Sequence, residues 1–393
     1  MKGSIAVRFI SDRIRFRGRI ASVCVAVSFL VMIVAVAVSS GFRTEIRDGL
    51  SSLCGDVLLT PLSRNYMGES DPIPASPAFL PEVLGLDCVE SVRGTVSRAG
   101  IVKVGDLIQG VLFKGVEDWR GKDPSVMSVS VPSRLASMLG IAEGDDIPAY
   151  FVGEKVIVRK FRVDSVYDGI LSSDDKLVVY TDLPTMRRVN GWGENEVSAL
   201  EVSLKKDFRD EESIRQSAVD IGAAVFSFSS EDEPTVVVSS VVQSFPQLFD
   251  WLNLIDLNVL VVLVLMTAVA GFNMISGLLI LLFENIPTIG LLKALGMTDR
   301  GISAVFLRSS AVLVGKGMLS GNAAALLLCL VQQKTHLLKL SPENYFVSFV
   351  PIDIDWTLLL TADAAAFAAI MLLLLLPAAF ISRIDPARTM KVD

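Results

Sequence analysis

The stretch NVLVVLVLMTAVAGFNMISGLLILLF, residues Asn258–Phe283, decides the fold of this chain. Positions 257–283 carry no charge, and at ~1.5 Å per residue they form a helix of ~40 Å, longer than the ~30 Å apolar core of a bilayer. The run is too long for a strand and too uniform for an ordinary buried helix. A compact polar segment, ENIPTIGLLKALGMTDRG, follows at Glu284–Gly301 and leads into a new apolar run. This order predicts a membrane helix that ends in a coupling element, on which a cytoplasmic partner could push.

Composition predicts a membrane part and a sizeable soluble part. Of 393 residues, 51% are hydrophobic and 20% are charged, and the mean hydropathy is +0.54, which is membrane-like but too polar for a chain that lies wholly in lipid. Four apolar segments are predicted to span the membrane, at residues 20–42, 257–283, 301–333 and 357–382. Both termini then lie on the same side of the membrane.

The distribution of charge predicts which side that is. Segments 1–19, 284–300 and 383–393 hold 11 of the 36 Lys and Arg residues. Of the 43 acidic residues they hold five, namely Asp12, Glu284, Asp299, Asp385 and Asp393. This positive-inside bias places both termini and the 284–300 segment in the cytoplasm. No basic stripe with interleaved aromatic residues is present in the sequence, which argues against nucleic-acid binding.

The N-terminal region predicts an anchor. Residues 1–19 place apolar side chains at helical spacing between basic ones, which indicates an amphipathic helix on the inner leaflet, with a solvated basic tail as the alternative. The run 20–42 is about twice the length of a signal-peptide core, which favours an uncleaved anchor over a cleaved signal.

Cys24 and Cys329 fall in apolar runs and are expected only to pack. Cys54 and Cys88 fall where a disulfide would be permitted, and the sequence leaves that bond open.

Residues 43–250 are predicted to form one large extracytoplasmic α+β domain between the first two spans, long enough to bury its own core. Pro61–Pro81 is rich in Pro, Ser and Gly and is typical of a loop. We expect a helix at Asp207–Gly222 and, after it, a strand at Ala223–Phe228 that leads back to the membrane. Other elements are expected at Val89–Val96, Gly110–Val116, Pro132–Leu139, Ile147–Val152, Val156–Tyr167 and Lys176–Tyr180. Residues 334–356 form a short outer loop in this topology, and 383–393 a cytoplasmic tail.

Catalytic chemistry is not expected of this chain. The single histidine, His336, lies beside the outer loop, which excludes His-based triads in practice and HExxH zinc sites outright. The nearest approach to a phosphate-binding loop is GVEDWRGKD at Gly115–Asp123, which has the wrong spacing and an Asp in place of the Mg²⁺-binding Ser or Thr. We therefore expect no enzyme activity, no metal and no bound cofactor. Active transport would need ATP and Mg²⁺ held by a separate ATPase subunit.

Four motifs together resemble a known family. AGFNMIS at Ala270–Ser276, followed by Glu284 and by IGLLKALG at Ile289–Gly296, is similar to the FtsX/MacB-type permease domain, and within it to the LolC/LolE lipoprotein-releasing permeases. Supporting matches lie at SSGFRTEI, SPENYFVSFVPIDI and IDPARTM, residues Ser39–Ile46, Ser341–Ile354 and Ile384–Met390. The resemblance implies a MacB-type (type VII) ABC permease: an α-helical membrane protein with four spans and a periplasmic α+β domain. That domain would be a porter-like base carrying a β-rich lobe at about 120–205.

The coupling candidates are Glu284, Thr288, Ile289, Leu292, Lys293, Leu295 and Gly296. Ile289, Leu292 and Leu295 are expected on one apolar helix face that seats in a groove of a partner, with a helix lying on the membrane surface as the alternative. Pro287-Thr288 suits a helix start, and Gly296 suits a left-handed stop. The family usually has a basic residue and an acid where this chain has Asn285 and Thr288, which weakens the case for salt-bridged docking.

The membrane candidates are Asn273, Lys316, Gly317, Gly321 and Asp363. Asn273 would line a cavity or form an interhelical hydrogen bond. Gly317 and Gly321 predict close helix packing. Lys316, deep in the third span, would pair with Asp363, face the transport path, or snorkel to the interface.

The resemblance implies a permease subunit of an ATP-driven complex in the bacterial inner membrane. Its partners would be two ATPase subunits, a second permease copy or paralogue, membrane lipids, a lipoprotein substrate and possibly a periplasmic carrier. In one subunit type of this family, a long excursion of the β-rich lobe, the hook, captures the periplasmic lipoprotein carrier. The matching segment here, YFVGEKVIVRK at Tyr150–Lys160, is predicted to close through a tight Gly153-Glu154 turn, which leaves no room for a hook. The alternatives are a MacB-like exporter of peptides or hydrophobic molecules, and an FtsX-like regulator of periplasmic cell-wall hydrolases.

Overall fold

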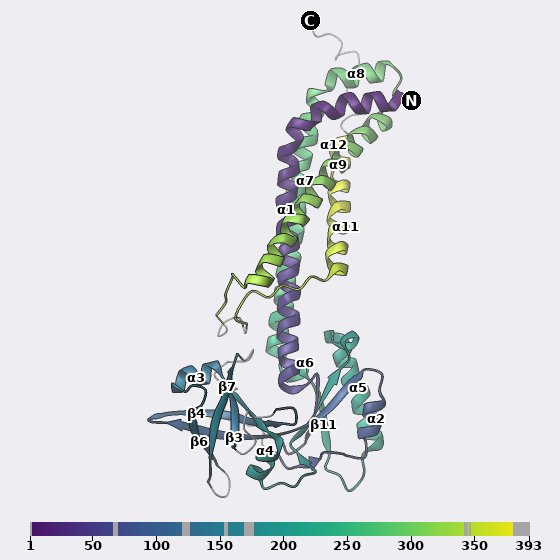
Figure 1. The fold of residues 1–393 in the computed structure, drawn as a ribbon. Coiled ribbons are helices and arrows are strands. Elements are labelled where there is room, and N and C mark those ends of the chain that lie inside the picture. The colour runs from purple at the N-terminus through teal and green to yellow at the C-terminus, as the bar shows by residue number, and fades with distance from the viewer. Residues whose placement is uncertain are drawn as a thin grey trace. The chain divides into compact units, whose positions relative to one another are not determined.

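The computed structural model describes residues 2–65, 70–119, 126–152, 156–168, 177–341, 345 and 347–379, with side chains from residue 21 onward. The chain forms two compact units, one helical and one α+β (Figure 1). The helical unit comprises Met1–Thr44, Trp251–Lys339 and Phe349–Asp393, and the α+β unit comprises Glu45–Asp250 with Leu340–Ser348. The predicted tail 383–393, the motif within it and the Gly153-Glu154 turn lie outside the described residues, as do the side chains of 1–19.

Within the described chain, four helical stretches are long and apolar enough to cross a membrane. They are α1 (Lys2–Cys54), α7 (Pro246–Glu284), α9 (Asp299–Thr335) and α11 (Trp356–Leu373), which continues into the short α12 (Leu375–Ala379). The predicted segments 20–42, 257–283 and 301–333 lie within α1, α7 and α9.

The fourth predicted span, 357–382, is not one regular helix, because a break at Leu374 separates α11 from α12. Pro377 explains the break: it has no amide hydrogen, and its ring clashes with the carbonyl of the residue four positions earlier. Residues 380–382 of this segment lie outside the described part of the chain.

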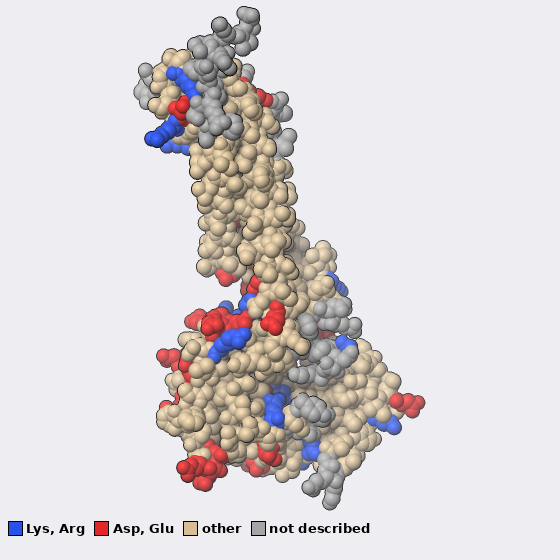
Figure 2. Space-filling model, turned by 180° about the vertical axis from the view of Figure 1, so that it is seen from behind, with Lys and Arg blue, Asp and Glu red and all other residues tan. Residues whose placement is uncertain are grey.

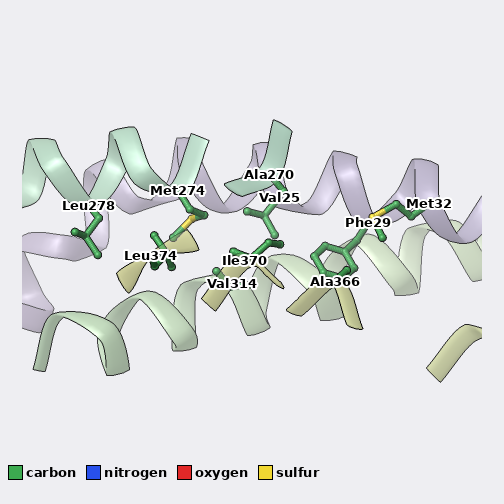
Figure 3. Packing of buried hydrophobic residues seen from close by; sticks show 10 residues of the cluster. All are labelled: Val25, Phe29, Met32, Ala270, Met274, Leu278, Val314, Ala366, Ile370 and Leu374. Carbon is green, nitrogen blue, oxygen red and sulfur yellow. The ribbon is translucent and has the colours of Figure 1, made fainter. Parts of the chain in front are cut away.

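One apolar core joins the four long helices (Figure 3). Its ten buried residues are Val25, Phe29 and Met32 of α1, Ala270, Met274 and Leu278 of α7, Val314 of α9, and Ala366, Ile370 and Leu374 of the last helical stretch. On α1 and α7 these residues recur every three or four positions, so they lie on one face of each helix. The opposite face of α7 is apolar as well, with Val261, Val264 and Phe272 exposed. Helices that are apolar on every side are typical of a membrane environment, and the middle of the helical unit shows few charged side chains in Figure 2.

The α+β unit is built on a nine-stranded sheet with the order β11-β1-β10-β3-β4-β8-β5-β7-β6. Its strands are β1 (Val57–Pro61), β3 (Val89–Val104), β4 (Leu107–Val116), β5 (Ser128–Pro132), β6 (Asp146–Phe151), β7 (Ile157–Tyr167), β8 (Val178–Asp182), β10 (Ala199–Leu204) and β11 (Val236–Ser240). A further pair joins β2 (Ile73–Pro74) to β9 (Glu196–Val197). The helices of this unit are α2 (Leu80–Gly85), α3 (Ser133–Leu139), α4 (Leu183–Asn190), α5 (Glu211–Phe228) and α6 (Val241–Ser244).

Strand β3 belongs to two parts of this sheet. Its first half pairs with β10, and its second half pairs with both β4 and β6. The β3–β6 pairing closes the strands from β3 to β6 into a ring, whose interior holds the packed rings of Phe113, Phe151 and Phe161. A Cβ at Gly100 would lie 3.0 Å from two of these rings, so a larger residue there would require the rings to shift. The β-rich lobe expected at about 120–205 therefore also includes β4 and half of β3, whereas β10 belongs to the flat part of the sheet.

The predicted strand at Ala223–Phe228 is wrong, because α5 continues through it to Phe228. Ile214, Ala218, Ile221 and Val225 are buried at helical spacing, so burial of one face carries the helix past Gly222. The strand that precedes α7 is instead β11, which pairs with β1. Cys54 and Cys88 are not joined by a disulfide; the Cys54 thiol donates to the Leu50 carbonyl, 3.3 Å away.

Candidate functional site

The coupling segment forms a separate short helix, α8 (Ile286–Ala294), between α7 and α9. Pro287 lies in its first turn, where a missing amide hydrogen costs no hydrogen bond. The helix begins at Ile286, slightly before the start expected at Pro287-Thr288. Asn285, one of the two departures from the family pattern, occupies the N-cap position, and its side-chain amide donates to the Leu281 carbonyl at 2.7 Å. This residue therefore closes the end of α7 instead of offering a charge to a partner.

The far end of α8 is closed by a Schellman motif. Gly296 has the positive φ of 87° that favours glycine, as its position in the sequence predicts. The amide of Met297 donates to the Leu292 carbonyl at 3.0 Å, and the amide of Gly296 donates to the Lys293 carbonyl at 2.9 Å. Lys293 also forms an ion pair of 2.8 Å with Asp299, the first residue of α9. This ion pair joins α8 to the start of α9.

The apolar face predicted for docking is not available to a partner as a whole. Ile289 is 1% exposed and packs in the chain's own core, against Leu282 of α7 and against Ile302 and Phe306 of α9. Leu292 is partly buried against the same cluster. This corrects the expectation that Ile289, Leu292 and Leu295 present one face outward. Helix α8 uses that face to hold itself to α7 and α9.

A different face of α8 is exposed and apolar. Leu291 is 54% exposed and Leu295 is 76% exposed. They are four residues apart and therefore neighbours on the helix surface, with exposed Pro287 one turn earlier. Thr288 is half-buried, and Glu284, the last residue of α7, is exposed. The arrangement is a helix packed against α7 and α9 that offers a leucine pair to another molecule.

Of the three possibilities left open for Lys316, pairing with Asp363 is not the one the structure has. Asp363, on α11, is 4% exposed and accepts a hydrogen bond from the side-chain amide of Asn322 on α9. Lys316 lies on the exposed surface of α9, and no described acidic side chain pairs with it. Sequence reasoning missed Asn322, although a polar residue six positions after Lys316 in the same span was a visible candidate.

Gly317 and Gly321 lie where α9 crosses α1. A Cβ at Gly317 would come within 2.9 Å of the Ser22 carbonyl oxygen, and one at Gly321 within 2.3 Å of the Ala26 carbonyl oxygen. The tight packing expected of these two glycines is thus present, and α1 is its partner. Asn273, on α7, is half-buried, and no hydrogen bond from its side chain reaches another described residue.

At the opposite end of the bundle from α8, a polar cluster joins α1 to α7. Arg43 of α1 forms an ion pair with Asp256 of α7 and donates to the Asn253 side chain at 3.2 Å. The Ser39 hydroxyl donates to the other carboxylate oxygen of Asp256 at 2.5 Å. Phe42 packs edge-on against the Trp251 ring, with centroids 5.9 Å apart. We call Ser39, Arg43, Asn253 and Asp256 the clasp.

The clasp also escaped sequence reasoning. Arg43 directly follows the apolar run 20–42, and Asp256 directly precedes the apolar run 257–283. Because both charges flank the same end of their spans and have opposite signs, that pattern could have indicated the pair. The loop before α11 reaches the same region, where Thr44 donates to the Asp353 carboxylate at 2.9 Å.

A buried ion pair, inside the α+β unit, holds the last turn of α1. Lys114 of β4 and Glu201 of β10 lie 2.6 Å apart and are both nearly inaccessible to solvent. The Lys114 ammonium also donates to the Leu53 carbonyl, in the C-terminal turn of α1, where cations are favoured. Thr95 donates to the same Glu201 oxygen at 3.3 Å, and burial raises the pKa of nearby Tyr180. The end of α1 is therefore fixed to the sheet by a charged side chain.

Comparisons with known proteins agree on the helical part of the chain. Residues 260–386, from α7 to beyond α12, match the FtsX-like permease C-terminal family. Over 400 residues the chain is 22% identical to the lipoprotein-releasing system transmembrane protein LolC of Xylella fastidiosa, covering 94% of this chain and 92% of that protein. LolC of Neisseria meningitidis serogroup B is likewise 22% identical, over 408 residues, with the same shares covered.

Among solved structures, the periplasmic region of MacB from Actinobacillus actinomycetemcomitans is 14% identical, with a TM-score of 0.32, and covers 51% of this chain and 95% of that one. The family match includes α8, Asn273 and the polar pair of Asn322 and Asp363. The four apolar helices and the family match lead to the same conclusion. The chain is a membrane protein with an FtsX-like permease domain, similar over most of its length to lipoprotein-releasing transmembrane proteins.

Proposed function

We propose that this chain is the permease subunit of an ATP-driven complex that extracts lipoproteins from the outer leaflet of the bacterial inner membrane and passes them to a periplasmic carrier. The similarity to LolC over 94% of the chain supports this cargo. In this proposal both termini and α8 lie in the cytoplasm, in agreement with the excess of Lys and Arg there, and the α+β unit lies in the periplasm. Two copies of a separate ATPase supply hydrolysis, and a second permease copy or paralogue completes the complex.

The observation that carries the proposal is the geometry of α8. A helix that only lay on the membrane surface would need no tight attachment to its neighbours. Helix α8 instead buries Ile289 against α9 and forms an ion pair with Asp299, the first residue of α9. It leaves Leu291 and Leu295 exposed. An ATPase groove that takes up these two leucines would move α8 and the adjoining ends of α7 and α9 together.

The clasp extends the path of this motion. Because Arg43 and Asp256 join α1 to α7 at the far end of the bundle, a displacement of α7 is passed to α1 at that level. Helix α1 continues without a break to Cys54, and its last turn is fixed by Lys114. Helix α7 begins at Pro246, six residues after β11 ends. Helix α7 thus runs from the coupling segment to the α+β unit, and α1, which the clasp joins to α7, runs into the same unit.

The coupling step is tested by Leu291→Asp in the full complex with its ATPase. A charge on the exposed face must lose its hydration when the groove closes on it, so ATPase stimulation should fall by roughly tenfold or more, as for a loss of ~1.4 kcal/mol. Leu107→Asp is the matched control, because Leu107 is 52% exposed, much like Leu291, but lies on β4. It should leave the stimulation unchanged. Equal stimulation in wild type and Leu291→Asp would refute docking through this face.

The cargo is tested separately, by purifying the complex with its lipids and identifying the bound acyl species by mass spectrometry. Enrichment of acylated lipoproteins over membrane phospholipids is the expected result. Recovery of peptides or hydrophobic small molecules would indicate a MacB-like exporter. Recovery of a cell-wall hydrolase without acylated cargo would indicate an FtsX-like regulator, and either result would overturn lipoprotein extraction.

A further inference from the structure

Lys316 is a charged residue within a membrane-spanning helix, and no described acidic side chain pairs with it. It lies near the middle of α9, between Asp299 and Thr335, with exposed apolar neighbours at Val312 and Leu319. A lysine that faces lipid tails is costly unless its ammonium reaches an anion or water. The expected partner, Asp363, is buried and bonded to Asn322 instead. Lys316 therefore needs water or an anion from outside the described part of its own chain.

A second copy of this chain offers no described carboxylate for that role. Asp256 is held by Arg43, and Asp299 is held by Lys293. Asp363 is buried inside the bundle, and Glu284 already has an interaction partner. The Lys316 stem can extend toward the cytoplasmic interface, where the most abundant anion is a lipid phosphate.

The surface around Lys316 suits such an anion. Stepping back along α9 by four residues at a time gives Val312, Arg308, Ala304 and Arg300, all exposed. Arg308 lies ~12 Å from Lys316 along the axis. Helical side chains tilt toward the N-terminus of their helix, so the Lys316 stem extends toward the level of Arg308, which lies about 80° further round the helix. Beside Lys316, a Cβ at Gly315 would meet no atom within 4 Å, which leaves the helix surface open there.

We propose that Arg308 and Lys316 form a binding site on α9 for the phosphate of an anionic phospholipid, whose acyl chains lie over Gly315 and Leu319. In the proposed topology the N-terminal half of α9 lies in the cytoplasmic leaflet, where anionic lipids attract basic residues. The site would anchor α9 beside α8 and make the coupling end of the bundle sensitive to lipid charge. It rests on the proposed membrane placement but not on the cargo or the ATPase.

The test uses the full chain in nanodiscs of phosphatidylcholine with increasing phosphatidylglycerol, without ATPase or lipoprotein. Native mass spectrometry measures retained phosphatidylglycerol, and thermal unfolding measures the stabilisation it gives. Lys316→Met should bind phosphatidylglycerol roughly fivefold more weakly, the loss expected for one basic residue at an anionic surface. Arg308→Met should weaken it similarly, and Lys316→Arg should restore it.

Lys334→Met is the matched control, because Lys334 is an exposed lysine in the last turn of the same helix. It should retain wild-type binding. Equal phosphatidylglycerol retention in wild type and Lys316→Met would overturn the site, and so would an equal loss in Lys334→Met, which would indicate only general attraction of charge. Because no ATPase is present, neither result depends on whether α8 docks as proposed.

Discussion

The crossing of α1 and α9 makes a quantitative prediction for Gly321→Ala. An added Cβ would lie 2.3 Å from the Ala26 carbonyl oxygen and 3.1 Å from the carbonyl carbon. Both are backbone atoms of α1 that cannot rotate away, so the helices must separate locally by roughly 1 Å to reach ordinary contact. Overpacking of this kind costs about 1–3 kcal/mol, and the higher helix propensity of Ala recovers up to ~1 kcal/mol. We expect a net loss of about 0–2 kcal/mol of unfolding free energy relative to wild type.

Gly315→Ala supplies the matched control on the same helix. A Cβ there meets no atom within 4 Å, so this substitution should leave stability unchanged or slightly raised. Both variants are measured as full chains in one detergent, by denaturant or thermal unfolding of the helical signal. Disulfide cross-linking between cysteines placed on α1 and α9 reports whether the helices have separated. If Gly321→Ala is as stable as Gly315→Ala, the close approach of α9 to α1 is absent from the protein.

Three further predictions concern charged groups. Lys114→Met should lower the unfolding free energy by about 3–5 kcal/mol because it leaves Glu201 buried and unpaired. The double variant Lys114→Met with Glu201→Gln should recover most of this loss. An equal loss of unfolding free energy in the double variant would contradict the pairing. Lys316→Met and Asp363→Asn should have additive effects on stability, since these side chains do not interact; a double-mutant cycle with a coupling above ~0.5 kcal/mol would restore their pairing. Asp210→Ala should cost about 1 kcal/mol at pH 7, because Asp210 caps α5. The hydrogen bond from Ser213 lowers the pKa of Asp210, so the cap's contribution is complete above the unfolded pKa of about 3.9 and is lost as the pH falls through the lower folded pKa. Thermal unfolding of both forms at pH 7 and pH 3 should show the difference shrinking in acid, and a constant difference would exclude a role for the carboxylate charge.

The sequence alone determined the features that depend on local composition. Length and uniform apolarity predicted where long helices run, because a span needs only enough consecutive apolar residues. The stop at Gly296 followed from the one residue type that adopts a positive φ without strain. Gly317 and Gly321 predicted a close helix crossing, because two small residues four positions apart leave one side of a helix flat.

Only the tertiary structure decided which residues meet. Helical spacing placed Ile289 on an apolar face, but apolarity does not distinguish a face that binds a partner from one that packs on Phe306 of the same chain. Pairing of Lys316 with Asp363 was one of three possibilities because they were the visible opposite charges, whereas the fold brought the neutral Asn322 to the carboxylate. The helix through Ala223–Phe228 was missed because a short apolar run satisfies either period, and burial against the sheet selects the helix. Arg43 with Asp256, and Lys114 with Glu201, are more than 80 residues apart in sequence. Their pairing depends on how α1 lies against α7 and how β10 lies in the sheet, which local sequence does not encode.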